Sequence, residues 1–336
     1  MAAPAAAAGL GIFDGQGDVG SVLHKGSVEY DAARGTYRLT GSGENMWATA
    51  DAFLFVWKKV SGDVSLSADV SFPDTAGEAH KKAVLVIRQS LDADSAYADA
   101  ALHGNGLTSL QSRETAGAAT HEIQANVSGP KRLRITKLGK YVYMSIAGEG
   151  EELHPAGGEM PLDLQEPYYV GIGVCAHNKD AITSATFSNV QIGPAPSGPL
   201  KLYSTLETIT VASTDRRAVY FAPGRIEAAH WQSDSAVLFW REGTAYRLPA
   251  DGGTASPSAY WGSRPRPGEG RVPSPDKARA AFFTYLEENI LLQVQNEEDG
   301  KITTLAKLPG GDGTISPPDW SPDGKRLVFV SYQMLP

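Results

Sequence analysis

The chain has 336 residues, a formal net charge of -8 and a pI near 5.4. This length exceeds a typical single core, so two domains are expected. The negative charge argues against a nucleic-acid ligand, because binding to a phosphate backbone needs a concentrated positive surface. No stretch has the apolar length that spans a bilayer. The single cysteine, Cys175, cannot form an internal disulfide, and we expect a small core residue there.

The N-terminal segment, residues 1–9, is rich in alanine. It lacks the basic region and the long apolar core of a signal peptide, but it resembles the small-residue tail that follows such a core. We interpret it as the start of a mature exported form, which predicts a periplasmic or secreted protein. The ordinary N-terminus of a cytoplasmic protein is the alternative.

Short alternating runs with many glycines and prolines, and little helical periodicity, predict an all-β protein. The Pro/Gly/Ser run Gly193–Pro199 is the clearest linker. We therefore place a β-sandwich domain at 10–193, a linker at 194–200 and a second domain at 201–336. Eight runs predict the strands of the sandwich: Val64–Val70, Ala83–Arg88, Tyr97–His103, Thr108–Arg113, Arg132–Thr136, Tyr141–Ser145, Tyr169–Cys175 and Ala185–Val190.

Four segments of the first domain resemble the concanavalin A-like (laminin-G-like) sandwich domains of poorly defined function: Phe55–Asp63, Lys82–Arg88, His103–Leu107 and Ala185–Val190. Such domains occur in bacterial secreted proteins, including fusions to TolB-like repeats. The resemblance implies an architecture. It implies no activity, because this sandwich is shared by lectins, glycosidases and inert spacers.

Strand alternation predicts a polar surface on the sandwich. Residues two apart in a strand share a face, which places Asp99 with His103, and Gln111 with Arg113. Planar donors and acceptors beside an aromatic ring are what a sugar site needs. The sequence thus predicts a carbohydrate or similar polar ligand, bound by Glu44, Asn45, Trp47, Arg88, Tyr97, Asp99, His103, Gln111, Arg113 and His177.

A structural alternative explains the same residues. Arg88, Asp99 and Arg113 could form cross-strand charge pairs on a solvated sheet, with the two histidines at strand ends. Trp47 would then belong to the core. Trp57 is assigned to the core in either interpretation.

No catalytic motif is found. The Glu-x-Asp-x-x-Glu pattern of some sandwich glycosidases is absent, as is a serine nucleophile elbow. A carbohydrate-active enzyme, a glycoside hydrolase or lyase with acids such as Glu44, Asp99 or Glu122, remains an alternative to a binding protein. A structural protein that binds no small ligand is the third possible function.

The pair Asp92 and Asp94 raises the question of calcium, because alternate oxygen ligands can wrap a cation. The EF-hand pattern fails at Ala96, and a turn between two strands explains both aspartates. We expect no cofactor and no metal, with a structural calcium ion as the alternative.

The last third contains a degenerate repeat. Trp231–Asp234, Pro273–Lys277 and Trp320–Gly324 each precede an apolar, aromatic-rich run. Their recurrence at roughly forty to fifty residues is the period of a β-propeller blade. The repeats resemble the TolB-type, WD40-like propeller repeats of bacterial periplasmic proteins, in which this turn links the first two strands of a blade. In the middle copy Lys277 replaces the turn glycine.

Only about three units are found, whereas propellers have about four to eight blades. Predicted strands at 206–211 and 217–221 lack a turn of their own and are expected to complete the final blade. The aromatic residues are expected in the blade cores and the turn aspartates as caps: Trp231, Trp240, Trp261, Trp320, Asp276 and Asp323.

The open array leaves two outcomes for its edges. Two chains could pair into about six blades as a homodimer, which we favour, or the sandwich domain or the linker could cover the exposed face within one chain. The sequence as a whole predicts an extracytoplasmic binding protein whose propeller region is an interaction scaffold.

Overall fold

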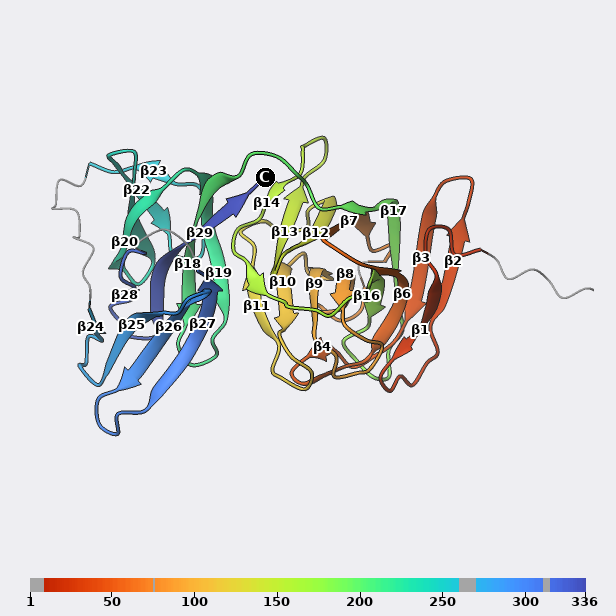
Figure 1. The fold of residues 1–336 in the computed structure, drawn as a ribbon, viewed down its shortest axis with the longest axis horizontal. Coiled ribbons are helices and arrows are strands. Elements are labelled where there is room, and N and C mark those ends of the chain that lie inside the picture. Colours follow the sequence, from red (N-terminus) through yellow and green to blue (C-terminus); the bar gives the residue numbers. More distant parts are fainter. Residues whose placement is uncertain (1–8, 75, 260–269, 311–314) are drawn as a thin grey trace, which may run out of the picture.

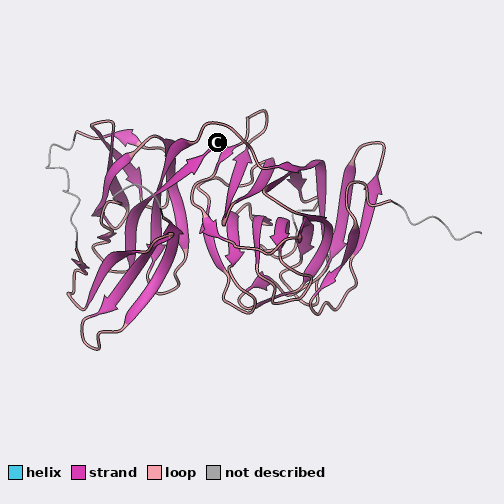
Figure 2. Cartoon of the chain, in the orientation of Figure 1, coloured by secondary structure: helices cyan, strands magenta, loops and turns pink. Residues whose placement is uncertain are grey.

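A computed structural model describes residues 9–74, 76–259, 270–310 and 315–336. These residues form strands and loops and contain no helix (Figure 2). The prediction of an all-β protein is confirmed. Within the same residues, no helix is long and apolar enough to cross a membrane. The predicted leader remnant and Trp261 lie outside the described residues.

Two facing sheets form a sandwich from fifteen of the first seventeen strands, and these seventeen strands are here called the sandwich lobe (Figure 1). The first sheet contains, in spatial order, β1 (Gly15–Val19), β6 (Phe53–Val60), β16 (Tyr168–Cys175), β8 (Lys82–Arg88), β9 (Tyr97–His103), β10 (Thr108–Arg113) and β11 (His121–Gln124). The second contains β14 (His154–Pro155), β13 (Tyr141–Ala147), β12 (Arg132–Leu138), β7 (Val64–Ser71), β17 (Thr183–Pro194), β3 (Thr36–Gly41) and β2 (Ser27–Asp31), and β15 (Met160–Pro161) pairs with β13.

The core of the sandwich lies between these sheets and takes every second residue of each strand. Leu85, Ala100, Leu133 and Phe187 are fully buried there in one large apolar cluster. All eight predicted strands are present, and β9 and β10 have the predicted bounds. The alternation therefore leaves the other residues of β8, β9 and β10 on the far face of the first sheet, here called the outer face.

Three four-stranded sheets make up the second part, here called the blade lobe (Figure 1). One contains β20 (Ile226–Ser233), β21 (Ala236–Arg241), β22 (Thr244–Pro249) and β23 (Ser256–Pro257). Another contains β24 (Val272–Pro273), β25 (Arg279–Tyr285), β26 (Asn289–Asn296) and β27 (Ile302–Pro309). The last contains β28 (Asp319–Trp320), β29 (Arg326–Leu335), β18 (Lys201–Thr210) and β19 (Arg216–Pro223).

The last sheet is closed by strands from the start of the blade lobe, as the sequence predicted. β18 pairs with β29 over ten residue pairs, and β19 adds the outer strand. This sheet packs between the other two. Phe329 faces Leu292 of one neighbour, and Val328 and Val330 on the opposite side face Val237 of the other.

The repeated turns hold each blade sheet together at its first hairpin. The Ser321 hydroxyl donates to Asp323 at 2.6 Å, and the Lys325 amide donates to the same carboxylate oxygen at 3.0 Å. The prediction that Asp276 and Asp323 cap their turns is confirmed. Gly324 has φ +67°, and Lys277 in the middle copy has φ +59°. The lysine thus adopts the left-handed backbone conformation, which costs less conformational free energy for glycine than for a residue with a side chain.

A parallel pairing joins the two lobes into one sheet. Ile123 and Gln124 of β11 pair with Arg216 and Arg217 of β19, which makes the first sandwich sheet and the last blade sheet continuous over eleven strands. The outer edge of this blade is therefore covered within the chain (Figure 1). The division into domains at 10–193 and 201–336 stays a proposal, because each half would lose its pairing partner at this seam.

Candidate functional site

The candidate site lies on the outer face of the first sandwich sheet. Tyr97, Asp99 and His103 of β9 share this face, while Ala98, Ala100 and Leu102 between them belong to the sandwich core. The predicted alternation therefore holds. A short hairpin of β4 (Met46–Trp47) and β5 (Ala50–Asp51) lies against this face, and Met46 is fully buried under it.

One part of the face is closed by this hairpin. Arg113 is fully buried, and its two terminal nitrogens donate to the Asp51 carboxylate at 3.0 and 2.8 Å. The same guanidinium donates to main-chain oxygens of Ala48 and Ser95, among others. Arg88 lies 3.6 Å from the same carboxylate. These contacts fix the hairpin on the sheet, and we call Asp51, Arg88 and Arg113 the hairpin anchor.

Because the hairpin covers this part of the face, the predicted exposure of four ligand-binding residues is wrong. Arg88, Tyr97, Asp99 and Arg113 have no exposed surface, whereas the sequence prediction placed them on a solvent-facing sheet. The physical reason is the hairpin, which comes from a distant part of the chain and covers the sheet. The alternative of charge pairs on a solvated sheet is wrong for the same reason.

The other part of the face is an open cleft of about 350 Å³ beside Trp47. Ten residues line it, of which five were predicted to bind a ligand and five were not. The predicted ones are Asn45, Trp47, His103, Gln111 and His177, and the others are His80, Lys82, Glu122 and Gln124, with Leu107 completing the wall. We call this space the Trp47 cleft.

Lys82 was missed because the sequence interpretation started its strand one residue later. Its position, two residues before Val84, places it on the outer face with Arg88. The ammonium donates to the Met46 carbonyl at 2.6 Å and to the Gln111 amide oxygen at 3.0 Å. Burial lowers the pKa of Lys82, and the carboxyl of Asp99 opposes this effect. Lys82 thereby orients the Gln111 amide at the floor of the cleft.

A row of polar side chains crosses neighbouring strands at this floor. Gln111 pairs in register with Asp99 on one side and with Glu122 on the other. The Gln111 amide nitrogen donates to Glu122 at 3.4 Å, and the Gln124 amide donates to the second oxygen of that carboxylate at 2.7 Å. The two amides hold the Glu122 carboxylate at the wall of the cleft.

Three imidazole rings line the same cleft. The His80 ring lies 5.6 Å from that of His103 and 5.5 Å from that of His177, between centroids. The Nδ1 atoms of His103 and His177 are buried without a hydrogen-bond partner. Burial, reinforced by Lys82, lowers the pKa of His103 to about 3, so this ring is neutral at neutral pH. The Nε2 atom of His103 contacts the Ser109 hydroxyl at 3.4 Å, so Nδ1 is the ring nitrogen left without a partner.

Asp99 lies beneath the cleft rather than in its wall. Both of its carboxyl oxygens are buried without a hydrogen-bond partner. Burial raises the pKa of Asp99 to about 8, against the opposing charge of Lys82. The side chain is thus mostly protonated at neutral pH, which avoids a buried unpaired charge.

Glu44 lies in a different space. It lines a second cleft of about 740 Å³ on the other side of the hairpin, which shares Asn45, Trp47 and His177 with the Trp47 cleft. The acids considered for an enzyme are therefore separated: Glu44 in one cleft, Glu122 in the other and Asp99 buried.

The structure also shows where three residues discussed from the sequence lie: Cys175, Trp57 and Asp92. Cys175 is fully buried as predicted, and burial raises the pKa of its thiol to about 11. Trp57 is half-buried on the outer face rather than in the sandwich core, where it packs beside Tyr169. The Asp92 carboxylate accepts the Ser90 hydroxyl within the predicted turn. In the part of the chain that the structure describes, no three His, Cys, Asp or Glu side chains are arranged to hold a metal ion.

The blade tryptophans are buried as predicted. Trp231 and Trp320 lie in the two clusters between blade sheets, and Trp240 packs with Leu238 on the far face of its own sheet.

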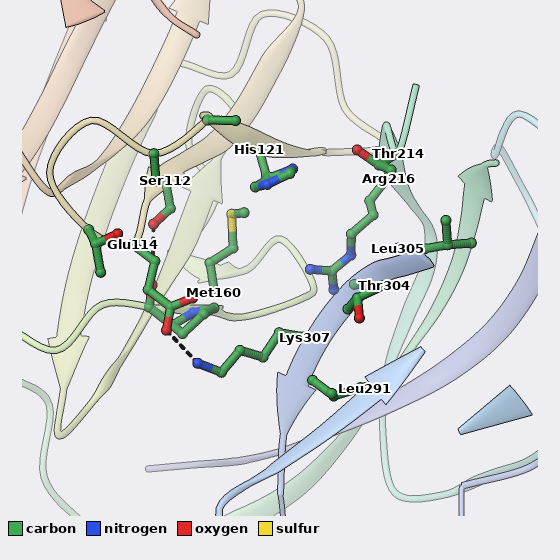
Figure 3. Close-up of a pocket in the computed structure, with 15 residues that line it drawn as sticks. Ser112, Glu114, His121, Met160, Thr214, Arg216, Leu291, Thr304, Leu305 and Lys307 are labelled. Carbon is green, nitrogen blue, oxygen red and sulfur yellow. Dashed lines mark hydrogen bonds and ion pairs between the residues drawn. The ribbon is translucent and has the colours of Figure 1, made fainter. Parts of the chain in front are cut away.

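A further cavity of about 390 Å³ lies where the lobes meet (Figure 3). Lys307 of β27 reaches across it to form an ion pair with Glu114 of the sandwich lobe. Arg216 is held by the Glu207 carboxylate at 2.9 and 3.1 Å. The cations named here are thus already neutralised by the protein, and we assign this cavity to the packing of the two lobes.

Comparisons with known proteins give a partial and distant likeness. No family model matches the chain. A stretch of 119 residues is 30% identical to the uncharacterized protein Atu1656 of Agrobacterium fabrum, and the match covers 32% of this chain and 41% of that protein. The chain therefore matches less than half the length of this relative.

Three solved structures show similar elements at low TM-scores. A functionally unknown protein of Saccharomyces cerevisiae is 16% identical, with a TM-score of 0.41 over 51% of this chain and 93% of its own. A putative TolB of Agrobacterium tumefaciens is 13% identical, with a TM-score of 0.17 over 75% and 99%. The LG1-3 region of the laminin α2 chain is 8% identical, with a TM-score of 0.23 over 81% and 58%. We base no functional assignment on likeness at this level.

Proposed function

We propose that the protein is an extracytoplasmic binding protein whose Trp47 cleft binds a carbohydrate or a similar polar ligand. The observation that carries this proposal is the convergence of amide, imidazole and ammonium groups around one half-exposed tryptophan. Hydroxyl groups of a sugar pair well with such planar donors and acceptors, and the indole ring supports the C–H face of a pyranose. The buried, unpartnered Nδ1 of His103 leaves hydrogen-bonding capacity for a ligand.

The blade lobe is proposed as a scaffold for interactions, and a homodimer remains our prediction for its open faces. The parallel seam between β11 and β19 already covers one blade edge within the chain. Light scattering at micromolar concentration tests the dimer, and a monomer at all concentrations would contradict it. Export stays our prediction, and a fusion of the gene to a periplasm-specific reporter tests it.

An enzyme acting on carbohydrate is the second candidate, and Glu122 is the observation that favours it. Glycoside hydrolysis needs two carboxyl groups facing each other across the scissile bond, about 5 to 10 Å apart. Among the described residues that line the Trp47 cleft, Glu122 is the one carboxylate. Asp99 is two strands away on the same face but has no exposed surface. The arrangement therefore supports binding better than turnover.

A glycan-array screen combined with a polysaccharide-degradation assay on the full chain tests both candidates. We expect binding without turnover, and loss of binding in His103→Ala. Turnover that disappears in Glu122→Gln would support the enzyme instead, and silence in both assays would contradict both candidates. The full chain is needed, because residues 1–195 alone would expose the edge of β11 that pairs with β19.

A further inference from the structure

A cleft of about 710 Å³ lies between the lobes and shares no residue with the Trp47 cleft. Its walls are largely apolar and include Leu202, Ile290 and Ile315. A space of this size accommodates a small organic ligand. Its polar groups include Glu159 from the sandwich lobe and Arg225 and Tyr332 from the blade lobe. We call this space the Glu159 cleft.

The backbone before Glu159 is tightly held against the blade lobe. A Cβ atom on Gly157, which has φ +93°, would lie 2.8 Å from the Thr205 methyl group. The Gly158 amide donates to the Thr205 hydroxyl at 3.0 Å, and that hydroxyl donates to Gln333 at 3.1 Å. The side chain of Glu159 is thus placed by the packing of the two lobes, and only 7% of the residue is exposed.

The Glu159 carboxyl lacks the partners that other buried carboxylates have. Among the described residues, no hydrogen bond or ion pair to it is found. By contrast, Glu207 in the adjacent sheet accepts from Arg216 and from Ser331. Burial alone raises the pKa of Glu159 to about 8. A buried acid without a partner destabilises the fold, so its presence at the wall of a cleft calls for a functional explanation.

We propose that the Glu159 cleft binds a small organic monocation, an ammonium or guanidinium group on an apolar body, with Glu159 as the anionic anchor. The cation supplies the missing partner of the carboxylate, and the apolar walls bury the body of the ligand. The Arg225 guanidinium, stacked 4.6 Å from the centre of the Tyr332 ring, adds positive charge to the wall. A second cationic group on the ligand would meet this charge, so a monocation is favoured over a dication.

Binding of such a cation is coupled to proton release. Because Glu159 is mostly protonated below pH 8 in the free protein, the cation binds its ionised minority, and the observed affinity rises with pH until the carboxyl is ionised. The pKa values of Tyr141 and Tyr143 are raised further above their ordinary value near 10, so neither tyrosine accounts for a change between pH 6 and 8. The ion pair of Lys140 and Glu288 near Tyr141 raises the pKa of the lysine and lowers that of the glutamate.

Calorimetric titration of the full chain with phenethylammonium, and with 2-phenylethanol as its neutral counterpart, tests the proposal. We expect the ammonium to bind at least about tenfold more tightly than the alcohol at pH 8. Its affinity should rise by about tenfold from pH 6 to pH 7 and by about fivefold from pH 7 to pH 8. Titrations in two buffers of different ionisation enthalpy should show close to one proton released at pH 6. Equal affinities, or no binding of the ammonium at millimolar concentration, would overturn the proposal.

Two variants distinguish a direct contact of the ligand with the Glu159 carboxylate from the general electrostatic potential of the region. Glu159→Gln, which keeps the side-chain shape, should abolish the preference for the ammonium and its pH dependence. Glu288→Gln removes an exposed carboxylate near the same cleft and should change the affinity by less than about twofold. Equal losses in both would overturn the role of Glu159. His103→Ala in the Trp47 cleft should leave ammonium binding unchanged, so failure of the proposed sugar site is measured separately.

A spectroscopic measurement on the unmodified chain keeps the test independent of how the variants fold. Carbon-13 NMR of the Glu159 carboxyl should show a raised pKa that falls towards its ordinary value when phenethylammonium is added. A pKa that does not respond to the ligand would contradict the proposal.

Discussion

Two neighbouring parts of the outer sandwich face bury ionisable groups in opposite ways. In the hairpin anchor, Arg113 donates to both oxygens of Asp51 and to several main-chain carbonyls. Beside the Trp47 cleft, both oxygens of Asp99 and the Nδ1 of His103 have no partner. The two parts lie on the same strands, since Gln111 of the cleft and Arg113 of the anchor are two residues apart in β10.

This difference distinguishes residues that stabilise the fold from residues that are available to a ligand on the same surface. A buried polar group with all its partners holds the fold, and removing one partner leaves the other charge uncompensated. A buried polar group without partners weakens the fold and is kept where a ligand or a proton can use it. We therefore assign the hairpin anchor to the fold, although the Nη1 atom of Arg88 is also buried without a partner. Ligand binding at the Trp47 cleft stays our proposal.

The largest expected effect comes from the hairpin anchor. Asp51→Asn leaves two buried guanidinium groups without their carboxylate, and we expect a loss of about 3–5 kcal/mol in the free energy of unfolding. Urea denaturation measures it. Asp14→Asn, at an exposed ion pair with Lys58, is the matched control and should have little effect. A loss for Asp51→Asn no larger than that of the control would contradict the assignment.

A smaller effect of opposite sign is expected at Asp99. The pKa of Asp99 is about 8 in the folded protein and near 3.8 in the unfolded chain, so the folded state holds the extra proton between these values. The stability contribution of this group is therefore lost as pH rises through that window. Asp99→Asn lacks this titration, and we expect it to be about 1–3 kcal/mol more stable, relative to the parent, at pH 8 than at pH 5. Thermal unfolding of both proteins at the two pH values checks the difference, and a difference that does not change with pH would be inconsistent with a buried, unpartnered acid.

The smallest effect is expected at the surface of the lobe junction. Lys140 and Glu288 form an exposed ion pair between the lobes at 2.9 Å. Lys140→Ala should leave the melting temperature unchanged within error, because solvent and salt screen such pairs. A clear drop in melting temperature would show that the junction depends on this pair more than on the seam of β11 and β19.

The sequence predicted those features that follow from local pattern. Period-two alternation placed Asp99 and His103 on one face, and the turn pattern located the first hairpin of each blade sheet. Closure of the last blade followed from two strands without a turn of their own. Each of these was predicted from a pattern within a short segment, although the closure itself joins β18 to the distant β29.

The features that were missed depend on contacts between distant segments. The burial of Arg88 and Arg113 results from a hairpin at residues 46–51, which no alternation in β8 or β10 reveals. The role of Glu122 depends on the short strand β11, whose four residues give too little alternation to predict a strand. Because the predicted strand began at Ala83 and β8 begins at Lys82, the prediction did not include Lys82 among the residues of the outer face.

A matched pair of tryptophan variants, titrated calorimetrically with the best oligosaccharide from the glycan screen, tests the ligand site most directly. Trp47 lines the Trp47 cleft, whereas Trp57 lies on the same face beside Tyr169 and outside the cleft. We predict that Trp47→Ala loses at least about tenfold in affinity, as expected for one aromatic platform, while Trp57→Ala binds like the parent. Equal affinities of the two variants, or a larger loss for Trp57→Ala, would contradict the assignment of the ligand site to this cleft.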